Sequence, residues 1–425
     1  MKAKNLSALA TALVTTLLLA LLPSANADVP TSLTFLGKGY GHGVGMSQIG
    51  ARGMALAGDT ATAIINYYFP NTDVVPLPDD QILRVNVGHQ LSTLKITGAT
   101  AGMNWQVISG IASDTTTAIL LAAKDSVTFT IGENKVAANL VKSGVKSNLP
   151  MTAAFTIRWS GTRYLDGTSS LITVAHSNKT TLYKYGQLQV KAIKDATLGV
   201  RLELINSVRL HDEYLWGVSE VPSSWPAASL EAQAIASRSY AFSKAGKIQK
   251  SCDCDLYGSI SDQVFAGFAK ESEVKWGALW KAAVSRTSIS ESTGLVVARN
   301  NIALKTFFTS STGGVTETSL NAWRTDVGYT ASVPDPNSLD PKLNPNYFKW
   351  QRQITQSVLA TAFLLPDVAS VKILSLNQTG TVKYIEGKSS SGKKVKLTGE
   401  IFRSRCKLPS PWFELASVSS VSVQN

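Results

Sequence analysis

The alternation of apolar and polar positions predicts a β-rich region in the first half of the chain. Between about residues 80 and 210, short segments alternate apolar with polar side chains, or contain runs of β-branched residues. Turns rich in Gly, Asn and Ser separate these segments, and a period of two is typical of half-buried strands. The clearest predicted strands are Ile82–Val85, Leu94–Ile96, Ser126–Ile131, Ala154–Trp159 and Leu182–Val190.

After the β-rich region, helical patterns appear again from residue 211. The longest is rich in Ala, is entered through Pro226 and ends near Gly246, which are the residues expected at the two ends of a helix. Strands followed by mixed helices and strands predict an α+β fold, with an antiparallel sheet and helices in one core and a β-rich accessory region. The elements predicted here are the helices Asp212–Val218, Ala227–Lys244 and Lys275–Ser285, the strands Gly294–Val297 and Ile302–Phe308, and a Pro- and Asn-rich connection, Asp335–Pro345.

Residues 28–76 open with an unusual glycine pattern. Glycines at positions 37, 39, 41, 43 and 45 alternate with other residues. A strand here would have one face without side chains, which lets another backbone or a ligand approach closely. Ser47 can then cap a helix from Gln48 to Ala57, and Asp59 can cap a second helix that ends at Tyr68.

The first 27 residues have the pattern of a secretory signal. Lys2 and Lys4 precede an uncharged run from Leu6 to Leu22, and Ala25-Asn26-Ala27 matches the small-x-small pattern of a cleavage site. We therefore expect a secreted protein that is cut after Ala27. The alternative is an uncleaved membrane anchor, because the apolar run is close to the length that spans a bilayer.

Composition narrows the class of partner. The chain has 425 residues, 44% of them apolar and 16% charged, so it can form true cores and is neither disordered nor a disulfide scaffold. Its net charge is +12, and removal of Lys2 and Lys4 leaves 12 − 2 = +10. This excess suits an anionic wall polymer or membrane face. Nucleic acid is disfavoured, since a secreted chain without a zinc-finger, RNP or helix-turn-helix pattern offers no module to bind it.

Several familiar catalytic patterns are absent. The four histidines, His42, His89, His176 and His211, form no His-Glu-x-x-His motif, and Gly45–Gly50 is out of step with the Gly-x-Ser-x-Gly elbow. A cysteine nucleophile paired with His42 has no local support. Cys252 and Cys254 could bind a metal or form a disulfide, and we favour structural pairing, with Cys406 left over.

One carboxylate lies in a loop whose composition suits acid catalysis. Glu220 lies between two predicted helices and precedes Val-Pro-Ser-Ser-Trp-Pro, so two prolines stiffen the loop and an aromatic ring flanks it. Apolar neighbours favour the protonated form of a carboxyl group, which a general acid needs near neutral pH. The alternative is structural, with Glu220 capping a helix or pairing with Arg238.

The same stretch resembles the SpoIID/LytB family, the relatives of stage II sporulation protein D. The family hallmark contains Tyr-Leu-x-Gly-Val, then Glu, Trp-Pro, Ala-Gln-Ala and Arg-x-Tyr-Ala, and Glu213–Phe242 reads EYLWGVSEVPSSWPAASLEAQAIASRSYAF. The Gly-rich stretch GYGHGVGMSQIGA is the other family signature. The matching segments are Gly39–Ala51, Glu213–Phe242, Asp262–Gly267, Ser310–Glu317 and Gly399–Phe413.

The resemblance implies a lytic transglycosylase that cleaves the MurNAc-GlcNAc bond of peptidoglycan glycan strands with a single carboxylic acid. Carried over by motif, Glu220 is the acid/base. Some relatives have a zinc site of His and Cys, but only Cys252 and Cys254 stand at that place, so we expect no metal, and the reaction needs no cofactor. By the same carry-over, the residues expected to line the glycan site are Arg238, Gln263, Ser311, Thr312, His42 and Gln48. His42 has an equal alternative role as a prop for the Gly-rich strand.

The family offers a second function and an unusual chain order. LytB members are described as amidase enhancers, non-catalytic proteins that bind the wall or a cell-wall amidase and stimulate it. In the usual order the GHGVGMSQ motif comes last, whereas here it comes first, so the chain looks circularly permuted, and we expect residues 33–39 to pack beside residues 414–423. The expected organisation is a signal peptide (1–27), a Gly-rich segment that returns to the core (28–76), a β-rich region (77–195) and a SpoIID/LytB core (196–425).

Overall fold

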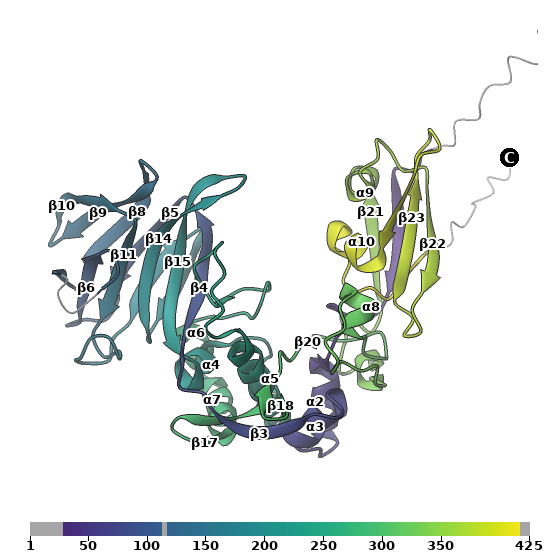
Figure 1. Ribbon diagram of the computed structural model, residues 1–425, viewed down its shortest axis with the longest axis horizontal. Coiled ribbons are helices and arrows are strands. Elements are labelled where there is room, and N and C mark those ends of the chain that lie inside the picture. Colours follow the sequence, from purple (N-terminus) through teal and green to yellow (C-terminus); the bar gives the residue numbers. More distant parts are fainter. Residues whose placement is uncertain (1–28, 113–116, 417–425) are drawn as a thin grey trace, which may run out of the picture. The chain divides into compact units, whose positions relative to one another are not determined.

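The computed structural model describes residues 29–112 and 117–416, so the expected signal peptide lies outside the described residues (Figure 1). The chain forms two compact units: the larger is Gly43–Pro345, and the smaller combines Met1–His42 with Asn346–Asn425. The boundaries expected after residues 76 and 195 do not coincide with the edges of these units. Helices and mostly antiparallel strands confirm the α+β class. Among the described residues, no helix is long and apolar enough to cross a membrane.

Two sheets form the β-rich part of the larger unit, and one hydrophobic core spans both. Trp105, Trp159, Phe129 and Phe155 are fully buried in that core. In the six-stranded sheet the order is β10-β9-β8-β5-β12-β13, and in the seven-stranded sheet it is β16-β4-β15-β14-β11-β6-β7. The bounds are β4 Ile82–Leu91, β5 Thr93–Gly98, β6 Asn104–Ser109, β7 Ala118–Ala122, β8 Ser126–Gly132, β9 Lys135–Lys142, β10 Val145–Thr152, β11 Ala154–Trp159, β12 Ile172–His176, β13 Lys179–Tyr183, β14 Gln187–Asp195, β15 Gly199–Arg209 and β16 Leu256–Tyr257.

The single strand predicted for residues 182–190 is wrong. Strand β13 ends at Tyr183 and β14 begins at Gln187, in the other sheet. Gly186 separates them with φ of 90°, and a Cβ there would lie 2.3 Å from Oδ1 of Asn206. The apolar positions change phase across Gly186, from Tyr183 and Tyr185 to Leu188 and Val190, and the single-strand prediction overlooked this break.

Helix α5, Ala227–Lys244, has the predicted bounds and packs against α2, α3, α7 and β18. Ser47 caps α2 by accepting from the Gly50 N–H, as predicted, but Thr60 rather than Asp59 caps α3. The predicted strand over residues 302–308 is instead two short strands, and the helix predicted from Asp212 begins earlier, as a π-helical turn. The remaining bounds are α2 Gln48–Leu56, α3 Ala61–Tyr68, the π-turn Leu210–Tyr214, α4 Leu215–Gly217, α6 Phe268–Glu271, α7 Gly277–Arg286, α8 Ser319–Trp323, a 3-10 turn Pro336–Leu339, β2 Met46–Ser47, β3 Asp73–Pro78, β17 Ser288–Ser290, β18 Thr293–Arg299, β19 Ile302–Ala303 and β20 Phe308–Thr309.

The alternating glycines do not form the predicted bare-faced strand. Strand β1 ends at Gly37, and Gly39, Gly41, Gly43 and Gly45 have φ of 82°, 110°, 81° and 77°. These left-handed backbone conformations are unfavourable for most other residues. The glycines therefore alternate because every second position has a positive φ angle. The expected close approach does occur at two of them, because a Cβ on Gly45 would lie 2.1 Å from the Phe307 carbonyl oxygen and a Cβ on Gly37 would lie 2.5 Å from the Trp412 carbonyl oxygen.

The smaller unit joins residues from both ends of the described chain. Strand β1 pairs antiparallel with β21 on one side and β25 on the other, with Leu36 opposite Gln351 and Glu414 (Figure 1). This confirms the predicted contact for residues 414–416, while residues 417–423 lie outside the described part. Phe35, Phe402 and Phe413 meet in its core. The bounds are β1 Ser32–Gly37, β21 Trp350–Thr355, β22 Ser370–Leu376, β23 Val382–Lys388, β24 Lys394–Thr398, β25 Phe413–Leu415, α9 Gln356–Phe363 and α10 Gly399–Cys406.

Candidate active site

The backbone around Glu220 is fixed on both sides. Before it, the Ser219 N–H donates to the Val264 carbonyl at 2.8 Å. After it, the Val221 carbonyl accepts a 2.7 Å hydrogen bond from Nζ of Lys270, a side chain that is almost fully buried. The loop between α4 and α5 is therefore tied to two neighbouring segments, in addition to the stiffness that its prolines provide.

The Glu220 carboxyl group is half-buried and accepts a hydrogen bond. The Val264 N–H donates to its Oε1 at 2.6 Å. Burial raises the pKa of Glu220 above its ordinary range, and the bond from Val264, which favours the carboxylate, opposes part of that rise. The carboxyl group thus keeps its proton to higher pH than an exposed glutamate does, as a general acid requires.

Two tyrosines lie within the electrostatic reach of this carboxylate. Burial raises the pKa of Tyr214 and of Tyr240, and negative charge on Glu220 raises both further. The Tyr240 hydroxyl donates to Oδ1 of Asp262 at 2.6 Å, and Nζ of Lys244 donates to the same oxygen at 2.6 Å. Both phenols therefore stay neutral near Glu220. Tyr240 and Asp262 were not among the predicted site residues, although both lie inside the motif segments Glu213–Phe242 and Asp262–Gly267.

Gln48 connects the Gly-rich segment to the Glu220 loop. Its Nε2 lies 3.4 Å from the backbone carbonyl oxygen of Glu220 and 3.2 Å from Oε1 of Gln233 on α5. Gln48 is itself buried. The structure therefore brings Gln48 and Glu220, two predicted site residues, together through the Glu220 backbone. This geometry gives Gln48 a role in positioning the loop that holds the carboxyl group.

Gln263 is fully buried beside the same loop. Its Oε1 accepts a hydrogen bond from the Tyr214 hydroxyl at 2.8 Å, and its Nε2 donates to the Ser237 carbonyl at 3.4 Å. Its amide therefore links the π-turn to α5, next to the Val264 N–H that holds Glu220.

Arg238 forms a buried ion pair. Its Nε lies 2.8 Å from Oδ2 of Asp79, and Nδ1 of His211 lies 2.6 Å from the other oxygen of that carboxylate. The guanidinium group also donates to the carbonyls of Thr287 and Leu295. Burial lowers the pKa of Arg238 to about 10, against the opposing effect of Asp79, so it remains charged at neutral pH. One alternative from the sequence was that Glu220 pairs with Arg238. Glu220 is not among the partners of the Arg238 guanidinium group in the described structure.

Thr312 lies in a buried network centred on Asp335, whereas the hydroxyl of the adjacent, fully buried Ser311 has no hydrogen-bond partner among the described residues. The Thr312 hydroxyl donates to Oδ2 of Asp335 at 2.7 Å, and the Ser338 hydroxyl donates to the same oxygen. Ser338 also contacts the helix-capping hydroxyl of Ser47 at 3.0 Å. Asp335 and Ser338 were not among the predicted site residues, because their Pro- and Asn-rich segment has the composition of a connecting loop.

Arg238, Gln263, Ser311 and Thr312 each have no exposed surface in this structure. Their polar groups face the protein, so the contacts with glycan expected of them stay predictions. His42 belongs to the smaller unit, where burial, with a smaller effect of Arg403, lowers its pKa to about 3. It is therefore neutral at physiological pH.

Arg52 is a candidate that sequence analysis did not select. Its guanidinium carbon lies 5.4 Å from the centre of the Trp225 ring, on the Glu220 loop, and its Nη1 donates to the Leu343 carbonyl. Its Nε is buried and has no hydrogen-bond partner among the described residues. A cation stacked on an indole beside the acid could contact a polar substituent of a ligand.

The cysteines have structural roles. Cys252 and Cys254 form a disulfide, which confirms the predicted structural pairing. Cys406 is free and buried, and burial raises the pKa of its thiol to about 12, so it is not a thiolate at neutral pH. Within residues 29–112 and 117–416, no group of three or more His, Cys, Asp or Glu side chains could hold a metal ion.

Replacing Gly217 with alanine is expected to destabilise the larger unit. The added Cβ would lie 2.4 Å from Cε2 of Phe265, whose ring stacks on Tyr214 at 5.4 Å. Overpacking of this kind costs about 1–3 kcal/mol, which urea unfolding would measure. The double variant Gly217→Ala/Phe265→Leu should recover part of the loss, and an unaltered midpoint in Gly217→Ala would contradict the expectation.

Comparison with known proteins supports the resemblance over part of the chain. Residues 199–291, which contain the Glu220 loop, match the family model for the stage II sporulation protein, SpoIID. The chain is 27% identical over 133 residues to stage II sporulation protein D of Bacillus subtilis (strain 168), covering 29% of this chain and 38% of that protein. A shorter stretch of 39 residues is 56% identical to the amidase enhancer of the same organism, covering 9% of this chain and 6% of that protein. A third match, to stage II sporulation protein D of Bacillus amyloliquefaciens, is 46% identical over 43 residues, 10% of this chain and 12% of that protein.

Proposed function

We propose that this protein is a secreted peptidoglycan lytic transglycosylase with Glu220 as its single acid/base. The supporting observation is the Glu220 carboxyl group, half-buried, with a raised pKa and a hydrogen bond of 2.6 Å from the Val264 N–H. It lies inside the stretch that matches SpoIID. The substrate would be the bond between N-acetylmuramic acid and N-acetylglucosamine.

The reaction needs one group that acts twice. The protonated carboxyl gives its proton to the bridging oxygen as the C1–O4 bond breaks. The resulting carboxylate then takes the proton from the sugar's own C6 hydroxyl as O6 bonds to C1, which leaves a 1,6-anhydro end. No water is consumed, so no second carboxylate at retaining or inverting spacing is required. Tyr214 and Tyr240 remain neutral and do not compete for the proton.

Product analysis tests this proposal directly. Purified protein would be incubated with peptidoglycan stripped of its stem peptides, and the products examined by mass spectrometry. We expect 1,6-anhydro ends from the wild type and none from Glu220→Gln. Hydrated reducing ends would indicate a hydrolase instead, and equal product from the variant would exclude Glu220 as the acid/base.

The pH dependence of cleavage should reflect the environment of Glu220. Because the acid must start protonated, the rate falls as pH rises through the pKa of Glu220, and burial moves that pKa above the ordinary glutamate range. We expect the alkaline limb of kcat/KM to lie at higher pH than for an exposed glutamate. A limb that falls within the ordinary carboxyl range would contradict a desolvated acid.

A second candidate function has support in one comparison. The relative that is 56% identical over 39 residues is named an amidase enhancer. On this alternative the protein binds wall glycan or a cell-wall amidase without cutting. It predicts that wild type and Glu220→Gln stimulate an added N-acetylmuramoyl-L-alanine amidase equally, and that neither forms anhydro ends.

The location and chain order are part of the proposal. The leader pattern before Asp28 and the net positive charge support export to an anionic cell wall, with membrane contact only if the leader stays uncleaved. The position of β1 between β21 and β25 supports circular permutation, since a Gly-rich segment that leads the chain pairs with residues near its other end.

A further inference from the structure

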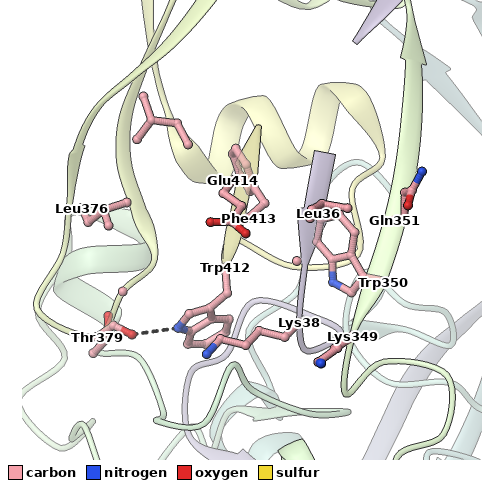
Figure 2. A pocket seen from close by; sticks show the side chains of 13 residues that line it. Leu36, Lys38, Lys349, Trp350, Gln351, Leu376, Thr379, Trp412, Phe413 and Glu414 are labelled. Atoms are coloured by element: carbon pink, nitrogen blue, oxygen red, sulfur yellow. Dashed lines mark hydrogen bonds between the residues drawn. The ribbon is translucent and has the colours of Figure 1, made fainter. Parts of the chain in front are cut away.

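The smaller unit contains a cavity of about 840 Å3 (Figure 2). It is lined by β21, β1 and β25 of one sheet and by β22 and the turn after it in the other. Ligand pockets typically measure roughly 300–1,000 Å3, so this volume could hold a short segment of chain. Glu220 belongs to the other compact unit, so a test of this cavity is independent of the proposed reaction.

The floor of the cavity is apolar. The indole N–H of Trp350 donates to the Gly39 carbonyl at 3.0 Å. The indole N–H of Trp412 donates to the Thr379 carbonyl at 2.8 Å (Figure 2). Both polar groups are therefore used, and the rings present only hydrocarbon surface to the cavity. Leu36 and the exposed Leu376 extend this surface along the walls. Such a lining favours an apolar side chain of a ligand.

One edge of strand β25 is unpaired beside this cavity. The Lys38 N–H donates to the Trp412 carbonyl and the Ala416 N–H donates to the Thr34 carbonyl. In an antiparallel ladder every second residue faces the partner strand, so the backbone groups of Phe413 and Leu415 point away from β1. Strand β25 ends the described sheet, and these groups have no hydrogen bond to any described residue.

Two lysines lie at one end of the cavity. Figure 2 shows the side chains of Lys38 and Lys349 below Trp412 and Trp350, with the Lys38 amino group on the side of Trp412, and both residues are exposed. Neither forms an ion pair within the part of the chain that the structure describes. Glu414 also lines the cavity, but no ion pair joins it to either lysine among the described residues, so a ligand group with negative charge would gain a favourable interaction at the lysines.

We propose that this cavity binds an extended acidic peptide segment of a partner protein, which adds as a strand to the free edge of β25. Its backbone bonds to Phe413 and Leu415, an apolar side chain packs on the tryptophan floor, and a carboxylate lies at Lys38 and Lys349. Unpaired edges are templates for strand addition, and main-chain bonds supply affinity while pockets for alternate side chains supply specificity.

The charge assignment can be tested with a defined probe. A fluorescent peptide Asp-Val-Thr-Val-Thr-Val-Asp with blocked ends would be titrated into the full chain, alongside the same peptide with Lys in place of Asp. We expect the acidic peptide to bind about tenfold more tightly. The double variant Lys38→Glu/Lys349→Glu should reverse this preference. Equal affinity of both peptides for wild type, or no binding of either, would overturn the proposal.

The strand addition has its own matched variants. Leu415→Pro removes an outward N–H that β1 does not use, whereas Leu415→Ala keeps it, so only the proline variant should bind the acidic peptide about fivefold more weakly. Equal binding by both variants would overturn the strand geometry.

Amide exchange identifies the occupant. Exchange at Phe413 and Leu415 should be fast in the free protein and slow with the peptide. Protection already present in the free monomer would assign the edge to the chain's own residues, such as 417–425. Protection that appears only with concentration-dependent dimers would assign it to a second copy, and either outcome overturns the partner-peptide proposal.

Discussion

Arg238→Met is expected to lower the free energy of unfolding by about 3–5 kcal/mol, because it leaves Asp79 charged and fully buried without its ion-pair partner. Among the described side chains, His211 would remain as the hydrogen-bonding neighbour of that carboxylate, at 2.6 Å. Urea unfolding followed by tryptophan fluorescence would measure the loss.

A double variant distinguishes the loss of the Arg238–Asp79 attraction from the cost of leaving one buried charge without a partner. Asp79→Asn/Arg238→Met removes both charges, and an amide oxygen can still accept from Nδ1 of His211, so the double variant should be clearly more stable than Arg238→Met alone. If Arg238→Met folds with normal stability but no longer binds glycan, the motif arginine contacts substrate in a conformation other than this one. That result would contradict the structural role assigned here.

Glu220→Gln is expected to reduce the rate of anhydro-end formation by about 10²–10⁴-fold, the usual contribution of a general acid. An amide cannot donate a proton to the leaving oxygen, yet its oxygen can still accept the Val264 N–H bond that holds the side chain. The loss should therefore appear in kcat more than in glycan affinity. Mass spectrometry of products in single-turnover and steady-state reactions would distinguish the two.

The same variant should be more stable than wild type at neutral pH. Since the folded pKa of Glu220 is raised, the carboxyl group favours folding below its unfolded pKa, and this contribution is lost as pH rises through the folded pKa. Glutamine does not titrate, so the advantage of Glu220→Gln should be greatest at alkaline pH and vanish in acid. A variant that is less stable at every pH would mean that the carboxylate has a structural role.

Sequence rules for helix starts and caps correctly predicted helices whose ends are determined by residues at those ends. Helix α5 starts after Pro226 and runs from Ala227 to Lys244 as expected, and Ser47 caps α2. The rules failed where two neighbouring residues could satisfy the same requirement, as when Thr60 rather than Asp59 capped α3. They also failed at the alternating glycines, because a period of two can reflect φ angles as well as faces of a strand.

The site was predictable in part for the same reason. The Glu220 loop could be found because its acid, prolines and tryptophan are contiguous in sequence. The Val264 N–H that holds the carboxyl group is a backbone group 44 residues away, and backbone donors leave no mark in a sequence. Asp335 and Asp79 bind motif side chains from segments with no motif of their own, so tertiary structure was needed to identify them.

The position of β1 also has a kinetic consequence. Its neighbour Lys38 accepts a hydrogen bond from Ser410 across a separation of 372 residues, so the strand is synthesised long before both of its partner strands exist. Contacts this distant in sequence are formed late and slowly. During synthesis the two edges of β1 would remain exposed, and the smaller unit could form its sheet only after residue 415 had emerged. Chaperones would therefore be needed to keep β1 from pairing with strands of other chains. Loss of the residues after Pro411 would remove β25, one of the two strands that pair with β1.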